Sequence, residues 1–211
     1  MDKVNLPMAK RVFDVVVSFV ALLILSPVVL LIVITMFLEM MVKADSSGKV
    51  FYKETRISQG EAFTLYKFRI FKESKLNGAK DSNGFVHTKD LEKDERNLTW
   101  TGRILKRIYM DELPQLINVL KGDMSLVGPR PTNMVNFKKR FAQGKRAKYL
   151  LRAGITGYFQ SHKGRKMKLD QEELDMIYAG YCKNKPGWWV LLYDIKILLI
   201  TMYTVLRAEG I

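Results

Sequence analysis

The chain has 211 residues, close to one ordinary domain, with 35 basic and 21 acidic side chains and a formal net charge of +14. A hydrophobic fraction of 48% excludes a wholly disordered chain, and a lone cysteine, Cys182, excludes a disulfide framework and, with two histidines, disfavours a zinc site. The positive excess predicts an anionic partner: nucleic acid, acidic lipid or a phosphorylated small molecule.

The first predicted element is an apolar run from Val15 to Leu38 that contains no charged side chain. As one helix it would be about 36 Å long at about 1.5 Å per residue. A bilayer core is about 30 Å thick, so the run is long enough to span it. It is too long for the core of a signal peptide and has no small-residue cleavage site, so we expect it to be retained.

Pro27 follows Ser26 near the middle of this run and predicts a kink, where Ser26 can bond a freed backbone carbonyl. Basic residues flank the run on both sides, and the positive-inside rule favours both flanks in the cytoplasm. A helix–break–helix hairpin satisfies that rule, and a kinked single span is the alternative. Arg11 and Asp14, three residues apart on one helical face, could pair at the membrane edge.

Two short β-prone runs follow, Val50–Lys53 and Phe63–Ile70, with a turn at Gly60. Cations and aromatics alternate in the second run, so Lys67 and Arg69 would share one face of a strand. That face is a candidate for binding phosphate, and an ordinary half-exposed strand is the other interpretation.

The next segments lead to two adjacent acids. Residues Lys72 to Asn97 predict a long polar surface loop, and Thr101 to Tyr109 a short basic helix. A further helix is predicted from Asp111 as N-cap to Gly122 as stop, because apolar residues follow its period at Leu113, Leu116, Ile117 and Leu120.

Asp111 and Glu112 would then lie at a helix N-terminus, where they could serve only as a cap and as dipole partners. The cations Lys67, Arg107 and Arg130 favour a second interpretation, in which carboxylates and cations hold Mg²⁺ and a diphosphate together. Asp111 could also attack phosphorus as a nucleophile. The helix dipole is expected to keep it ionised at neutral pH.

Two glycine-rich loops come next. Pro129 and Pro131 fix the backbone around Arg130, which would reduce the entropy lost in gripping a phosphate; an exposed arginine on a structural turn is the alternative. Gly154 to Gly157 form a second loop, a weak signal alone. The segment from Met124 to Leu169 contains no acidic residue. Apolar side chains alternate with its basic ones, as in an amphipathic helix at a membrane interface. The basic residues are Arg130, Lys138, Lys139, Arg140, Lys145, Arg146, Lys148, Arg152, Lys163, Arg165, Lys166 and Lys168.

The last predicted element is an apolar helix that begins at Trp188-Trp189 and runs to Leu206. Paired tryptophans suit a membrane–water interface. Asp194 argues against full insertion, and Lys196 two residues away does not face it on a helix. We expect the helix to lie in or near the interface, with a buried core helix as the alternative.

Together these segments resemble the bacterial sugar transferase family, the monotopic phosphoglycosyl transferases that start glycan assembly on undecaprenyl phosphate. The resemblance runs from about Ala9 to Arg207, and Asp111 to Pro131 carries most of it. The other matching stretches are Lys10-Arg11 with Asp14, Ser26-Pro27, Tyr66-Lys67-Phe68-Arg69, Gly154-Ile155-Thr156-Gly157 and Asp194-Ile195-Lys196-Ile197-Leu198.

The resemblance implies that Asp111 attacks the β-phosphate of a UDP-sugar, releases UMP and passes the phosphosugar to undecaprenyl phosphate. It implies that Asp111 and Glu112 form the catalytic dyad and hold Mg²⁺. Arg11, Ser26 and Pro27 would belong to a re-entrant helix on the cytoplasmic face of the bacterial inner membrane. The implied substrate-binding residues are Lys67, Arg69, Arg107, Arg130, Gln160, Arg165 and Asp194.

Some positions depart from the family pattern. Tyr158-Phe159-Gln160 replaces Trp-Ala-Gln, Ala153 replaces a proline, and the loop from Gln160 to Arg165 is one residue longer. The sugar and the role of Arg165 therefore stay open.

We expect a mostly helical α+β fold, with a membrane-inserted re-entrant helix in residues 1–43 and one catalytic region in residues 44–211. The expected partners are a UDP-sugar, undecaprenyl phosphate and membrane lipid; a homodimer is compatible with the sequence. Nucleic acid is not expected, because no recognition motif is present. Direct transfer in a ternary complex, and a non-catalytic binder of anionic lipid, remain the alternatives.

Overall fold

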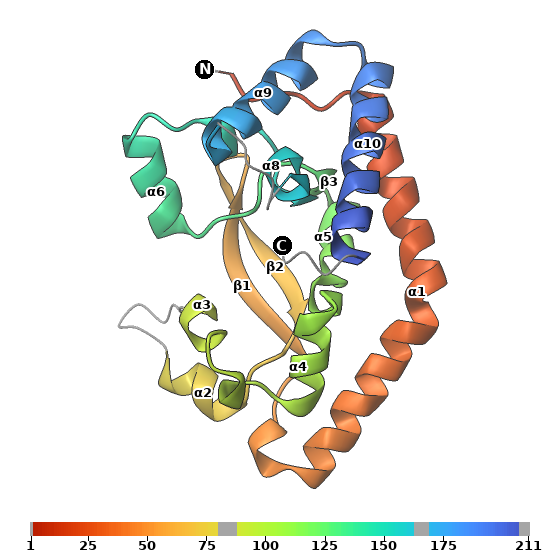
Figure 1. The fold of residues 1–211 in the computed structure, drawn as a ribbon, viewed down its shortest axis with the longest axis vertical. Helices are drawn as coiled ribbons and strands as arrows, with labels where there is room; N and C mark the ends of the chain where they lie inside the picture. Colours follow the sequence, from red (N-terminus) through yellow and green to blue (C-terminus); the bar gives the residue numbers. More distant parts are fainter. Residues whose placement is uncertain (1, 80–87, 163–168, 207–211) are drawn as a thin grey trace. The chain divides into compact units, whose positions relative to one another are not determined.

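The computed structural model describes residues 2–79, 88–162 and 169–206, and it has the expected mostly helical α+β fold (Figure 1). The chain divides into two compact units. Unit 1 comprises Met1–Ala21, Glu54–Leu65 and Gln115–Ile211, and unit 2 comprises Leu22–Lys53 and Tyr66–Pro114. The predicted division at residue 43 separates a membrane-inserted helix from a catalytic region, and it stays a prediction.

Helix α1, Met8–Val42, contributes to both units and is long and apolar enough to cross a membrane. It is continuous through Pro27, so the predicted interruption is wrong at the level of secondary structure. The Ser26 hydroxyl donates to the Leu23 carbonyl at 2.8 Å, as predicted. Pro27 has no N–H for that carbonyl, so the hydroxyl supplies the missing donor. The re-entrant path of α1 stays a prediction.

The predicted β-hairpin is confirmed, with a longer first strand. Strands β1, Phe51–Ser58, and β2, Glu61–Phe68, pair across a turn at Gln59 and Gly60, which both have positive φ angles. Positive φ at both central residues matches the twist of a hairpin. Each strand has residues in both units.

The rest of unit 2 consists of short helices. They are η1 (Ala44–Ser46), α2 (Glu73–Gly78), α3 (Thr88–Leu91), η2 (Glu95–Asn97), α4 (Trp100–Arg107) and η3 (Met110–Glu112). The predicted basic helix is α4. The segment expected as a polar loop instead holds α2, α3 and η2, because it contributes buried residues such as Leu76 to a core.

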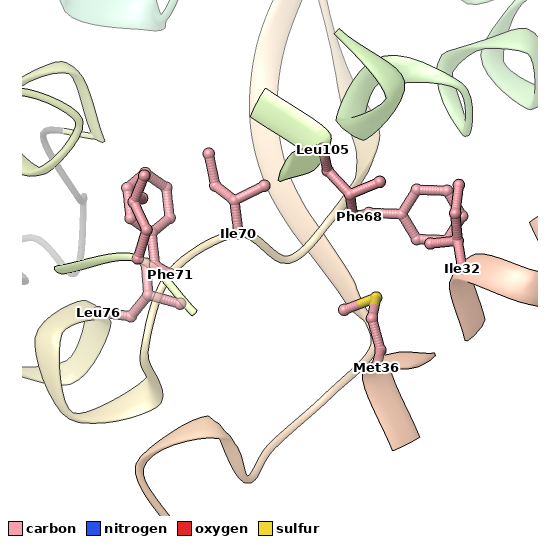
Figure 2. Close-up of a cluster of buried hydrophobic side chains, with 8 residues drawn as sticks. Ile32, Met36, Phe68, Ile70, Phe71, Leu76 and Leu105 are labelled. Carbon is pink, nitrogen blue, oxygen red and sulfur yellow. The ribbon is translucent and has the colours of Figure 1, made fainter. Parts of the chain in front are cut away.

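That core joins α1 to the hairpin and to α4. Ile32 and Met36 of α1 lie in one cluster with Phe68 at the end of β2 and Leu105 of α4 (Figure 2). Burying a large apolar side chain contributes about 1.5–3 kcal/mol. The second half of α1 is therefore part of the folded unit as well as a candidate membrane segment.

Unit 1 holds the remaining elements: α5 (Gln115–Lys121), β3 (Ser125–Val127), α6 (Met134–Ala142), α7 (Ala147–Leu150), β4 (Gly154–Thr156), α8 (Tyr158–Ser161), α9 (Gln171–Asn184) and α10 (Gly187–Leu206). The predicted C-terminal helix and basic amphipathic helix are α10 and α6. Helix α9 begins at a capping box formed by Asp170 and Glu173, a helix-start signal that the predicted elements do not include.

The two glycine-rich loops of the sequence meet in unit 1. Strands β3 and β4 pair in parallel, with Ser125 opposite Gly154 and Val127 opposite Thr156. A Cβ at Gly154 would lie 2.1 Å from the Gly128 nitrogen, so only glycine allows this approach. The weak signal around Gly154 therefore has a structural explanation.

A buried ion pair links the start of α1 to α10 in unit 1. The Lys10 ammonium lies 2.5 Å from the Asp194 carboxylate, which also accepts a bond from the Tyr178 hydroxyl at 2.5 Å. Lys10 and Asp194 are both fully buried. Figure 1 shows α10 beside the first turns of α1. Lys10, and not the neighbouring Lys196, is therefore the cation that compensates Asp194 within this apolar helix.

The predicted pair between Arg11 and Asp14 is wrong. Asp14 instead accepts bonds from the Ser125 hydroxyl and the Leu126 N–H. The Arg11 guanidinium donates to the carbonyls of Val119 and Leu120, in the last turn of α5, at 2.7 and 2.9 Å. A cation there satisfies carbonyls that lack partners within the helix and complements its dipole.

Candidate active site

The two candidate catalytic carboxylates lie in the short 3₁₀ turn η3, directly after α4. Tyr109, with φ +57°, turns the chain between these elements. Helix α5 begins only at Gln115, so the prediction that Asp111 caps its N-terminus is wrong. Pro114 ends the turn, and its fixed backbone suits the position just before a helix.

Lys67, near the end of β2, is the cation beside both carboxylates. Its ammonium donates to Glu112 at 2.8 Å and lies 3.9 Å from Asp111. The Glu112 contact is a close ion pair, while the Asp111 contact is at the limit of one. The structure thus brings together three of the predicted site residues, within one unit.

Burial dominates the electrostatics of Asp111. Its residue is 7% exposed, and loss of solvation raises the pKa of its carboxyl from 3.8 to about 6, against the attraction of Lys67; Glu112 and Glu92 raise it further. Asp111 does not lie at the N-terminus of α5, so the expected cause of its ionisation, a helix dipole, is wrong, although the carboxyl is still mostly ionised at neutral pH. At pH 7 it is still about 90% ionised, and it is more basic than an ordinary aspartate, which favours nucleophilic attack.

The two carboxylates also suit a divalent metal. Mg²⁺ prefers hard oxygen ligands and is commonly held by one or two carboxylates together with substrate phosphates and water. Asp111 and Glu112 provide such oxygens on one turn. Among the described residues no group of three or more acidic, histidine or cysteine side chains is placed to hold a metal.

Two further predicted site residues lie in unit 2. Arg107 is exposed at the end of α4, one turn before Asp111. Arg69 is 2% exposed and donates to the backbone carbonyls of Lys49, Phe71 and Ser46. The structure gives Arg69 a role in joining these loops, and its predicted contact with substrate stays a prediction.

Three more predicted site residues lie in unit 1. Arg130 is exposed, and its backbone carbonyl accepts a bond from Lys148. Gln160 is buried at the end of α8, and neither atom of its amide has a hydrogen-bond partner among the described residues. The Asp194 carboxylate accepts hydrogen bonds from the Lys10 ammonium and the Tyr178 hydroxyl. Their predicted share in the site stays a prediction, and Arg165 lies outside the described residues.

Sequence reasoning missed the residues that hold this scaffold in place. In the sequence, Lys10 is only one of several flanking charges, and Lys148 is one of many bases. The nearest signal is the presence of an acid, Asp194, inside an apolar helix, because a buried charge needs a partner. The partner lies 184 residues away in the sequence, so no local pattern could identify it.

Comparison with known proteins places these features in a family. The model of a family described as "Bacterial sugar transferase" matches residues 6–208. The chain is 35% identical to the "Uncharacterized sugar transferase EpsL" of Bacillus subtilis, over 96% of this chain and 89% of that protein. It is 34% identical to the "Undecaprenyl-phosphate galactose phosphotransferase" of Salmonella typhimurium, over 95% of this chain and 41% of that protein.

A third relative is the "UDP-glucose:undecaprenyl-phosphate glucose-1-phosphate transferase" of Escherichia coli, 32% identical over 92% of this chain and 39% of that protein. The chain thus covers most of the Bacillus protein and less than half of the other two.

Proposed function

Because the chain belongs to the bacterial sugar transferase family, we propose that it transfers a sugar phosphate from a UDP-sugar to undecaprenyl phosphate. The observation that carries this proposal is Asp111, a carboxylate made more basic by burial, beside the Lys67–Glu112 ion pair. The names of the Salmonella and Escherichia relatives describe the same class of reaction. The products would be an undecaprenyl-diphosphate sugar and UMP, the first membrane step of a glycan pathway such as that of a capsule, O-antigen, exopolysaccharide or glycoprotein.

In the first step, a carboxylate oxygen of Asp111 attacks the β-phosphorus of the UDP-sugar. A new oxygen–phosphorus bond forms, and the bond from that phosphorus to the bridging oxygen breaks. UMP leaves with the electron pair, and the sugar phosphate is now an acyl phosphate on Asp111. The raised pKa supports this role, because a more basic carboxylate is a better nucleophile as long as it is ionised.

In the second step, a phosphate oxygen of undecaprenyl phosphate attacks the same phosphorus and releases the Asp111 carboxylate. Lys67 neutralises charge beside Asp111 and Glu112, and Arg107, exposed at the end of α4 one turn before Asp111, would be a second cation for an incoming phosphate. Cations placed where negative charge develops lower the barrier of phosphoryl transfer. Mg²⁺ held by Asp111 and Glu112 would neutralise diphosphate charge when bound.

A direct test uses the full chain in nanodiscs that contain undecaprenyl phosphate, with UMP release as the readout. We expect Asp111→Asn to abolish release, and Asp90→Asn to leave it unchanged. Asp90 is a matched control because it is an exposed aspartate on α3 in the same unit. Near-normal release by the Asp111 variant would show that Asp111 is not the nucleophile, and no release by the wild-type chain would favour a non-catalytic binder.

The two-step route has a competitor, direct transfer in a ternary complex with Asp111 only as a metal ligand. Incubating the wild-type chain with UDP-sugar alone, followed by intact-mass measurement, separates the two routes. A mass increase of one phosphosugar, lost in Asp111→Asn, supports the covalent route. Its absence under conditions that give turnover supports direct transfer.

The sugar is a separate question, because the relatives differ in it. The names of the Salmonella and Escherichia relatives specify galactose and glucose, and that of a relative from Aeromonas hydrophila, 29% identical to this chain, specifies N-acetylgalactosamine. A panel of these three UDP-sugars, scored for UMP release, identifies the donor. A chain that releases UMP from none of them under these conditions would count against the UDP-sugar assignment.

We propose that both ends of α1 face the cytoplasm. Single cysteines at Lys3 and Lys49, in a Cys182→Ser background, can be labelled in intact cells with a membrane-impermeant reagent. We expect neither position to be labelled before lysis and both after it. Labelling of one position alone in intact cells would show that α1 crosses the membrane fully.

A further inference from the structure

A polar cavity of about 380 Å³ lies in unit 2, at the C-terminal end of α1. Its lining comes from that end, from η1 and from the start of α4, and includes Lys43, Lys72, Arg103 and Trp100. The volume lies within the range typical of small-ligand sites, about 300–1,000 Å³. We propose that this cavity binds the phosphate headgroup of an acidic membrane phospholipid, at a site separate from the catalytic carboxylates.

The charges of the lining favour an anion. Of its two acids, Glu39 accepts hydrogen bonds from the N–H groups of Trp100 and Thr101 and from Ser46, and Asp45 lies 3.5 Å from Lys72. Both carboxylates are therefore already compensated.

Two cations remain for a ligand. No hydrogen-bond or ion-pair partner is found in the described part of the chain for the Lys43 ammonium. Arg103 donates from Nε to the Glu95 carbonyl at 3.1 Å, which leaves its terminal guanidinium nitrogens for a phosphate. A guanidinium and an ammonium at one cavity suit a phosphate group.

The surfaces on either side of the cavity are apolar and exposed. Trp100 and Ile104 of α4 and Ile108 directly after it follow at intervals of four, and each is about half exposed. On α1, Met41 and Val42 are more than 80% exposed. A helix with apolar residues on one face and cations beside them is typical of a membrane interface. A headgroup in the cavity would thus have apolar surface beside it for its acyl chains.

This cavity and the catalytic carboxylates lie at opposite ends of α4. The cavity meets the start of the helix at Trp100, and η3 follows its end at Arg107. Eight residues of helix are about 12 Å long. A lipid headgroup in the cavity therefore leaves Asp111 accessible, so it would act as an anchor rather than as the acceptor of the reaction.

The test uses Trp100 as a reporter. The chain has three tryptophans, so Trp188→Phe with Trp189→Phe leaves Trp100 alone. The full chain is placed in phosphatidylcholine nanodiscs with a small fraction of brominated lipid, either phosphatidylglycerol or phosphatidylcholine. We expect brominated phosphatidylglycerol to quench Trp100 fluorescence more strongly. Equal quenching by the two lipids overturns the proposal.

Single substitutions then test whether the cavity is the source of the preference for phosphatidylglycerol. Lys43→Ala and Arg103→Ala should each lower the preference for phosphatidylglycerol about fivefold, the effect of one cation near an anionic headgroup. Lys49→Ala is the matched control, because Lys49 is an exposed lysine outside the lining. If Lys49→Ala lowers the preference as much as Lys43→Ala, overall charge sets it and the cavity does not. A Tm equal to that of the wild-type chain confirms that the two cavity variants fold.

Two additions identify the source of the phosphate. Inorganic phosphate should leave the quenching unchanged compared with chloride at the same ionic strength, and so should undecaprenyl phosphate. Loss of quenching with either would assign the cavity to a soluble anion or to the acceptor substrate, and would overturn the proposal. The preference should persist in Asp111→Asn, so that this test and the test of the reaction fail independently.

Discussion

Replacing Asp111 with asparagine should stabilise the protein at neutral pH while it abolishes transfer. The carboxyl is buried, and its pKa in the folded chain is raised from 3.8 to about 6. The folded state therefore binds the proton more tightly than the unfolded state does. Asparagine has nearly the shape of the protonated acid and carries no charge, so it removes the cost of burying the carboxylate.

The size of the effect follows from the pKa shift. A rise of roughly two units corresponds to about 3 kcal/mol, at about 1.4 kcal/mol per unit. Below the unfolded pKa of 3.8 the acid is protonated in both states and costs nothing. The cost grows as the pH rises from there through about 6 and is complete above that value. At pH 5 it is about half of its full size.

Thermal unfolding of the detergent-solubilised chain between pH 4 and pH 8 measures this dependence. For a chain of this size, about 3 kcal/mol corresponds to a rise in Tm of about 6–12 °C at pH 7.5. The gap between variant and wild type should shrink by about half at pH 5. Asp90→Asn, an exposed control, should move Tm little at any pH. A gap that is negative at pH 7.5, or independent of pH, would refute the reasoning.

Three other predictions concern the pH profile, the glycine contact and the buried pair. Transfer activity should fall on the acid side with an apparent pKa of about 6, because in the proposed mechanism only ionised Asp111 attacks; a profile flat from pH 8 to pH 5 would contradict this. Gly154→Ala should prevent stable folding, since its Cβ would lie 2.1 Å from a backbone nitrogen, whereas Gly180→Ala in α9, with open space around it, should stabilise by up to about 1 kcal/mol; both are read from Tm. Lys10→Met should destabilise by about 3–5 kcal/mol in denaturant unfolding, because it leaves Asp194 buried without its cation, and adding Asp194→Asn should recover much of the loss; no recovery would show that the charge is not the cause.

The elements that the sequence predicts well are those that a local pattern specifies. The hairpin of β1 and β2 follows from β-prone runs and a glycine turn, and α10 follows from its apolar run after two tryptophans. Strands β3 and β4 have three residues each and pair in parallel over a long separation. A pattern of that length is too short to recognise, so only the fold identifies it.

The candidate site divides in the same way. Its carboxylates and Lys67 are recognisable as motifs, and the structure brings them together. The prediction of a helix N-terminus at Asp111 is wrong because the apolar period of α5 continues in the sequence back over Pro114, past the true start at Gln115. The sequence also missed the raised pKa of Asp111, because burial depends on tertiary packing and here outweighs the local backbone.

Glu39 makes a mechanical connection between the apolar helix α1 and the turn that carries Asp111. This carboxylate near the end of α1 receives the first N–H groups of α4, so the apolar helix holds the start of the helix that leads directly to Asp111. A change in bilayer thickness that raises or lowers the end of α1 would therefore carry α4 with it. With α1 in a bilayer, the lipid composition would then set the height of Asp111 relative to the hydrocarbon.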